Sequence, residues 1–105
     1  MQNEILLVAE AVSSEKGLPK DAIFEAIEIA LAAATKKRYD TDSNIEVQIN
    51  KLTGEYDSFR IWDVVSEEEF EDTGLQILLD EAKLKDDSLE IGSAHKEEIE
   101  NIAFG

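Results

Sequence analysis

Three consecutive basic residues, Lys36, Lys37 and Arg38, are the side chains whose type and spacing best suit a specific chemistry, namely contact with phosphate. The chain has 10 Lys and Arg against 25 Asp and Glu, a formal net charge of −15. So many positive charges in one triplet can complement the carboxyl end of a helix dipole, for which one cation suffices. They can also contact the phosphates of RNA, beside the aromatic ring of Tyr39. The residues alone leave both interpretations open.

No other group of residues predicts catalysis, a metal site or a cofactor. His95 is the only histidine, cysteine is absent, and no glycine-rich phosphate-binding motif occurs. One histidine among scattered carboxylates does not predict metal binding, so we expect no metal, no cofactor and no enzymatic activity. The start of the chain does not resemble a signal peptide, and no apolar run approaches the ~20 residues of a membrane span. We therefore expect a cytoplasmic protein with no membrane partner.

The negative charge is concentrated in the second half of the chain. Residues 1–53 have 6 basic and 9 acidic residues, whereas residues 54–105 have 4 and 16. Such a balance repels nucleic acid at long range. Any RNA contact must therefore be local and supported by another partner, and a basic protein surface is the easier electrostatic match.

Two helices are predicted at the amino-terminal end. Residues 3–16 have apolar residues at helical spacing, with Asn3 as a plausible N-cap and Gly17 placed to end the helix. A second helix is expected over 18–38, with Pro19 at or before its first turn and the basic triplet at its end. Because about two residues join them, we expect an antiparallel helical hairpin.

The second helix has an alanine-rich face that predicts close packing. Ala26, Ala30 and Ala34 are four residues apart, so they present a flat strip that another element, first of all the first helix, can approach closely. We expect Phe24 and Leu31 to flank this core face. Its predicted members are Ile23, Ala26, Ile27, Ala30 and Ala34.

The remainder of the chain predicts a small sheet. Residues 45–50 and 59–65 alternate as strands, joined by a turn around Gly54 into an antiparallel hairpin. Residues 66–74 are an acidic loop, which we interpret as a solvated connection. Residues 75–87 are ambiguous between strand and short helix, favouring helix, and a last strand is expected around 96–102. The prediction is one α+β domain over 1–105, ordered α-α-β-β-α-β, with a mainly antiparallel sheet.

Several apolar residues lie off the predicted core faces. In the first helix these are Leu7 and Ala11; in the second, Ile29 and Ala32 belong to a stripe at 25, 29, 32 and 36. Such residues are often scattered surface side chains or contacts with the sheet. They can also form a groove for a partner's amphipathic helix, with Glu25 at its rim.

The sequence resembles the start of the NusA (N-utilisation substance A) family of bacterial transcription factors. The resemblance begins with "MQNEILLVAEAVSSEKGLPKDAIFEAIEIALAAATKKRY" and continues through "VQINKLTGEYDSFRIWDVV", "ILLDEAKLKDDSLEIG" and "IENIAFG". It departs from the family pattern at the long acidic loop "SEEEFEDTG" and at His95. The resemblance implies the amino-terminal domain of a longer factor, in which an S1 domain and two KH domains follow.

The resemblance also implies a function. Such a domain docks on RNA polymerase near the RNA exit channel, chiefly on the flap-tip helix of the β subunit. It promotes hairpin-dependent pausing and intrinsic termination, and antitermination together with other factors. We expect RNA contact to be weak or absent for the isolated domain, and the domain to be a monomer. The alternative is an acidic protein–protein adaptor that contacts no RNA.

The expected functional residues combine this resemblance with the helical geometry. Lys36, Lys37 and Arg38 would face the RNA hairpin. The expected polymerase-binding residues are Leu7, Ala11, Glu25, Ile29 and Ala32.

Overall fold

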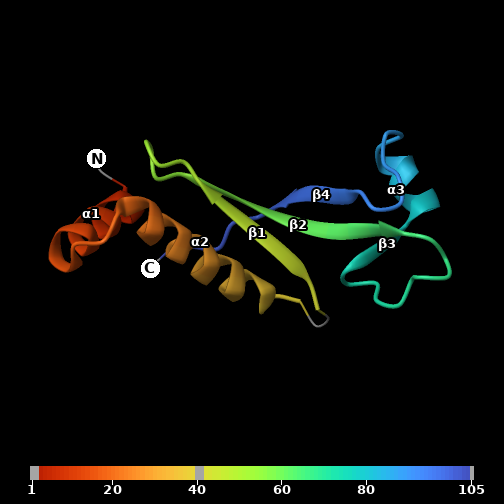
Figure 1. Cartoon of the computed structure of the whole chain (residues 1–105), viewed down its shortest axis with the longest axis horizontal. Helices are drawn as coiled ribbons and strands as arrows, with labels where there is room; N and C mark the ends of the chain where they lie inside the picture. Colours follow the sequence, from red (N-terminus) through yellow and green to blue (C-terminus); the bar gives the residue numbers. More distant parts are fainter. Residues whose placement is uncertain (1–2, 40–41, 105) are drawn as a thin grey trace.

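Two helices lie at one end of a four-stranded sheet, and a third helix lies at the other end (Figure 1). The structure is a computed structural model that describes residues 3–39 and 42–104, with extents of 51 × 26 × 23 Å. The elements are α1 (Glu4–Lys16), α2 (Lys20–Lys36), β1 (Asn44–Ile49), β2 (Tyr56–Val65), β3 (Gln76–Leu78), α3 (Leu79–Lys85) and β4 (Ala94–Ile99). The predicted α+β class is confirmed, whereas the predicted order lacked β3.

Both predicted ends of α1 are confirmed. The Asn3 side chain accepts a hydrogen bond from the Ile5 N–H at 2.7 Å, which satisfies one of the free donors of the first turn. Gly17 has the left-handed conformation, with φ of 68°, and its N–H donates to the Ser13 carbonyl. Pro19 immediately precedes α2 and provides no side-chain cap. The turn between the helices is therefore set by Gly17 and Pro19.

The long strand β2 organises the sheet because it pairs with each of the other strands. β1 pairs with it antiparallel, with Ile45 opposite Arg60, and β4 also pairs antiparallel, with His95 opposite Trp62. β3 pairs with its last three residues in parallel. The prediction of a mainly antiparallel sheet is thus confirmed, with one short parallel addition.

The segment that was ambiguous between strand and helix contains both. It forms the three-residue strand β3, and α3 begins at the next residue. The acidic loop before it is fixed at its end, because Gln76 Oε1 accepts the N–H groups of Glu71 and Asp72. Asp72 in turn accepts the N–H of Gly74. The loop is therefore a connection anchored by its own turn residues.

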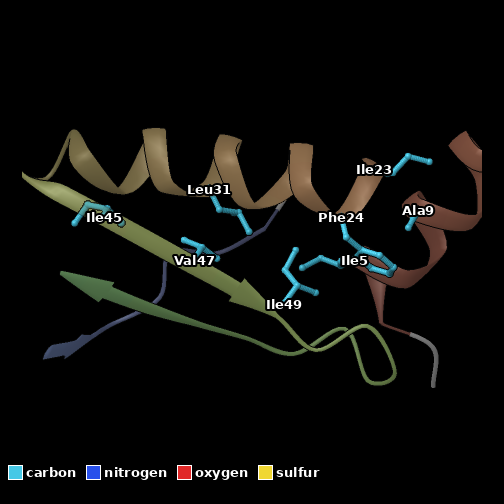
Figure 2. Close-up of a cluster of buried hydrophobic side chains, with 8 residues drawn as sticks. All are labelled: Ile5, Ala9, Ile23, Phe24, Leu31, Ile45, Val47 and Ile49. Carbon is cyan, nitrogen blue, oxygen red and sulfur yellow. The ribbon is translucent and has the colours of Figure 1, made fainter. Parts of the chain in front are cut away.

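The main hydrophobic core lies between α1, α2 and β1. Figure 2 shows α2 above β1, with Leu31 and Phe24 pointing toward the strand. The buried residues are Ile5, Ala9, Ile23, Phe24, Leu31, Ile45, Val47 and Ile49. Glu28 extends this contact, because its Oε2 accepts the N–H of Ile49 at 2.9 Å. α2 therefore covers one face of β1 and also satisfies a backbone donor of that strand.

The predicted core face of α2 is wrong in its alanines. Ala26, Ala30 and Ala34 are exposed, whereas Leu31 and the hydroxyl-bearing Thr35 are buried. Thr35 is 0 % exposed, and its hydroxyl donates to the Leu31 carbonyl at 2.6 Å, so burying it leaves no unsatisfied donor. The helix is consequently rotated so that its larger side chains, rather than its alanines, face the sheet.

A second, smaller core lies under α3. Val64 and Ala82 are almost completely buried there, together with Ile77 and Leu89. Trp62 packs against this second cluster, whereas Tyr39 packs against the main one. Arg60, whose guanidinium lies over both rings, therefore connects the two cores.

Candidate docking and RNA-facing surfaces

The basic triplet lies at the end of α2 and directly follows the buried residue Thr35. The backbone after Thr35 tightens into turns in which each N–H bonds the carbonyl three residues earlier, as at Arg38 and Tyr39. No left-handed residue is used, since Lys37 at the C-cap has φ of −66°. The carbonyl end of the helix and the cations thus lie together, as the dipole favours.

The three basic side chains have different surroundings. Lys36 and Lys37 are exposed and, within the described part of the chain, form no ion pair. Arg38 is also exposed, but its Nη1 donates to the Glu100 carbonyl at 2.6 Å. Arg38 therefore links the end of α2 to the segment that follows β4, while the lysines point to solvent.

A row of stacked side chains begins at Tyr39, directly after the triplet. The Arg60 guanidinium lies 4.4 Å from the centre of the Tyr39 ring and 4.8 Å from the centre of the Trp62 ring. The Trp62 ring stacks on His95 at 5.7 Å with an interplanar angle of 26°. Sequence reasoning missed this row; the only pattern that points to it is the placement of Arg60 and Trp62 on one face of β2.

Two carboxylates of the sheet have a lowered pKa: Glu97 at the end of this row, and Glu46 on the other face of the sheet. The hydrogen bond between His95 Nε2 and Glu97 Oε2, at 2.8 Å, lowers the pKa of the Glu97 carboxyl. Burial opposes this effect, and Lys85 lowers the pKa further. Lys96 likewise lowers the pKa of Glu46, to which it is hydrogen-bonded at 2.8 Å. Each of these acids therefore has a lysine neighbour, Lys85 at 3.4 Å from Glu97 and Lys96 at 2.8 Å from Glu46.

The expected polymerase-binding residues are mostly at the surface. Ile29 is 64 % exposed and Leu7 46 %, and Ala11 and Glu25 are exposed as well. Ala32 differs, because it is half-buried and packs against the main core, so the expectation that it points away from that core is wrong. We name the surface formed by Glu25 and Ile29 the outer stripe of α2.

A separate apolar groove lies on the other flank of α2, where the exposed alanines are. It has a volume of about 510 Å³, and its walls come from α1, α2 and the segment after β4. Val8, Ala30 and Phe104 are representative lining residues. The alanines that suggested core packing thus form the floor of a surface groove. Ile29, Leu7 and Ala11 do not line it.

The described part of the chain defines a class of protein rather than a reaction. Within residues 3–39 and 42–104, no group of His, Cys, Asp or Glu is placed to hold a metal ion. None of the described helices is long and apolar enough to cross a membrane. With its exposed apolar side chains, its groove and its clustered cations, the chain is a strongly acidic domain of the α+β class.

Comparison with known proteins identifies the family. The family described as NusA N-terminal domain matches residues 4–105, and the chain belongs to that family. It is 39 % identical over 89 residues to the transcription termination/antitermination protein NusA of Rickettsia conorii, and 38 % to that of Rickettsia prowazekii. In each case the match covers 85 % of this chain and 17 % of the relative.

A solved structure agrees with the fold. The solution structure of the N-terminal domain of NusA from B. subtilis superposes with a TM-score of 0.75 at 33 % sequence identity. The match covers 100 % of this chain and 83 % of that one. The α+β architecture described above is therefore that of the family.

Proposed function

We propose that this chain is the polymerase-docking domain of a transcription termination and antitermination factor. The observation that carries the proposal is its membership of the NusA N-terminal domain family over 4–105. The curated relatives are named transcription termination/antitermination proteins, and this chain spans about 17 % of their length. The domain docks near the β flap and the RNA exit channel, where it promotes hairpin-dependent pausing, intrinsic termination and, with other factors, antitermination.

Docking uses the exposed apolar residues of the helical end. Ile29 is the centre of the proposed surface, with Glu25 one turn before it. Leu7 and Ala11 extend the surface on α1, and Ala32 supports it from the edge of the core. Its partner is the flap-tip helix of the polymerase β subunit, whose apolar face would cover Ile29.

RNA contact depends on this docking. The net charge of −15 repels RNA in free solution. Once the domain is bound beside the exit channel, the effective concentration of the emerging hairpin is high, on the order of millimolar for a short connection. The cations at the end of α2 can then reduce the phosphate repulsion of the hairpin stem without appreciable affinity for free RNA.

The docking surface is tested by NMR titration of the labelled chain with the flap region of the β subunit. We expect the largest shifts at Leu7, Ala11 and Ile29, and weaker binding for Ile29→Ser. Ile91→Ser is the matched control, because Ile91 is also exposed, at 52 %, but lies near α3. Shifts confined to the open face of the sheet, or to the groove around Ala30, would refute this surface.

The division between docking and RNA contact is tested by removing the triplet. We expect Lys36→Ala/Lys37→Ala/Arg38→Ala to weaken hairpin-dependent pausing while polymerase binding is largely retained. An equal loss of both activities would contradict the division.

A pure adaptor function is the second candidate, and the net charge of −15 is the observation that favours it. An acidic domain of this kind would bind a basic protein surface and contact no RNA. Photo-crosslinking in an assembled elongation complex decides between the two. Retained polymerase binding without any crosslink between the triplet and RNA would favour the adaptor.

A further inference from the structure

The turn formed by residues 36–39 is held by two contacts with residues far away in the sequence. In the first, Arg38 donates to the Glu100 carbonyl at 2.6 Å, across 62 positions of sequence. In the second, the Tyr39 ring lies against the Arg60 guanidinium of β2 at 4.4 Å. Neither contact is needed to end the helix, because the backbone bonds after Thr35 already do so.

Arg60 is placed to act as a clamp. Its guanidinium lies between the Tyr39 and Trp62 rings, and its Nη2 donates to the Gly74 carbonyl at 3.1 Å. Its Nε is buried and, among the described residues, has no hydrogen-bond partner. Such a placement suits a planar, delocalised cation that stacks on rings, and a lysine ammonium would not reproduce it.

We propose that Arg60 and Arg38 are positioning residues that hold this turn rigid, so that Lys36 and Lys37 are the two cations that meet RNA phosphates. The proposal rests on the proposed function, and it reassigns Arg38 from RNA contact to anchoring. Lysine side chains lose conformational entropy when they bind. A rigid turn reduces the additional cost of ordering the backbone that presents them, which is the general advantage of preorganisation.

The alternative role for Arg60 is structural only, as a connection between the two hydrophobic cores. Both roles predict some loss of stability for Arg60→Met. Only the positioning role predicts that the end of α2 becomes mobile while α3 and its core stay ordered. The mobility of Lys36 and Lys37 is therefore the decisive measurement.

The first experiment measures backbone order by ¹⁵N relaxation of the 105-residue chain. In Arg60→Met, we expect the order parameters of the Lys36 and Lys37 amides to fall from about 0.85 toward about 0.6. Lys96→Met is the matched control, because Lys96 also stacks on a ring, that of Phe59 at 4.3 Å, on the other face of β2. We expect the control to leave the turn ordered.

Two further variants keep the test decisive if Arg60→Met unfolds. Tyr39→Leu removes one of the two rings that enclose Arg60 without altering β2, and it should mobilise the same two amides. Trp62 is the only tryptophan, so its fluorescence reports directly whether the stacked row has been disturbed. Arg60→Lys keeps the positive charge but not the planar guanidinium that stacks on the rings, and we expect it to behave like Arg60→Met.

The second experiment measures crosslinking of the chain to a 4-thiouridine-labelled hairpin in an elongation complex. For Arg60→Met we expect a loss of about 2- to 12-fold, the range that corresponds to ordering one long side chain. Its salt dependence should be unchanged, since the number of phosphates contacted is the same. Lys37→Ala should instead lower the slope of log yield against log salt by about 0.7–0.9.

The outcomes separate this proposal from the proposed function. Order parameters that stay unchanged in both Arg60→Met and Tyr39→Leu overturn the positioning role. A salt slope that falls for Arg38→Ala as it does for Lys37→Ala overturns the reassignment of Arg38. If the wild-type chain gives no crosslink at all, the proposed RNA contact fails, whereas loss of order in the variants still supports the positioning role.

Discussion

Three adjacent side chains of similar charge show how much a residue's role depends on contacts far away in sequence. The triplet predicts positive charge at a helix end, and the structure confirms that location. The carbonyl that binds Arg38, however, belongs to Glu100, and the arginine beneath Tyr39 belongs to the middle of β2. The residues next to the triplet in the sequence contain no information on these distant partners, Glu100 and Arg60. Only the fold therefore distinguishes Arg38, which is hydrogen-bonded to Glu100, from Lys36 and Lys37, which form no ion pair among the described residues.

Gly54 gives a prediction at the residue scale. It has φ of 77°, and a Cβ atom there would lie 2.6 Å from Asn3 Cγ, in the side chain that caps α1. Gly54→Ala therefore combines left-handed strain with displacement of the cap. We expect it to lower the free energy of unfolding by about 2–3 kcal/mol, measured by urea denaturation.

Gly17→Ala is the control for backbone strain alone. Gly17 has a similar φ of 68°, but a Cβ atom there would meet no atom within 4 Å. We expect a smaller loss, about 1 kcal/mol. Equal losses for the two variants would show that the contact between Gly54 and Asn3 has no energetic consequence.

At the scale of elements, the capping residues predicted where a helix begins and ends better than the apolar pattern predicted which helix face is buried. Asn3 and Gly17 gave the limits of α1 because capping is a local interaction. The predicted core face of α2 was wrong in its alanines, because alanine suits both a close helix contact and a solvent-exposed surface. Thr35 can be buried because its hydroxyl donates a hydrogen bond to the Leu31 carbonyl within the same helix. β3 was missed because three residues in a parallel pairing have no periodicity of their own.

The corrected orientation of α2 can be measured with two neighbouring residues. Leu31 is 6 % exposed in the main core, and Leu31→Ala should cost about 2–5 kcal/mol of unfolding free energy through lost contacts and a residual cavity. Ala30 is exposed at the groove, and Ala30→Gln should change stability by no more than about 0.5 kcal/mol. Urea denaturation of both variants is the measurement. A large loss of unfolding free energy in Ala30→Gln would show that the alanine face does pack in the core.

At the scale of the whole molecule, the basic turn is a local cluster of positive charge on a strongly acidic chain. The sheet separates the helical end from α3 along the 51 Å axis (Figure 1). Residues 54–105 carry 16 acidic residues, and one of them, Glu100, accepts a hydrogen bond from Arg38 through its backbone carbonyl. The basic turn lies at the end of α2 beside the middle of β2, where Tyr39 lies against Arg60, and its Lys36 and Lys37 are exposed with no ion pair among the described residues. A local positive surface can therefore exist on a molecule whose overall charge repels RNA.

This local cluster gives a prediction with a charge-matched control. Lys36→Ala/Lys37→Ala and Lys16→Ala/Lys20→Ala each remove two positive charges, but Lys20 begins α2 and Lys36 ends it. At 1.5 Å per residue the two ends are roughly 24 Å apart, well beyond the ~8 Å Debye length at physiological salt. If RNA responds to a local contact, only the first variant should shorten hairpin-stabilised pauses in an elongation complex. If it responds to net charge, both should do so equally, and the RNA-facing assignment of Lys36 and Lys37 would be wrong. Polymerase binding, measured in parallel, should be retained by both variants, because neither removes Ile29 or Leu7 from the proposed docking surface.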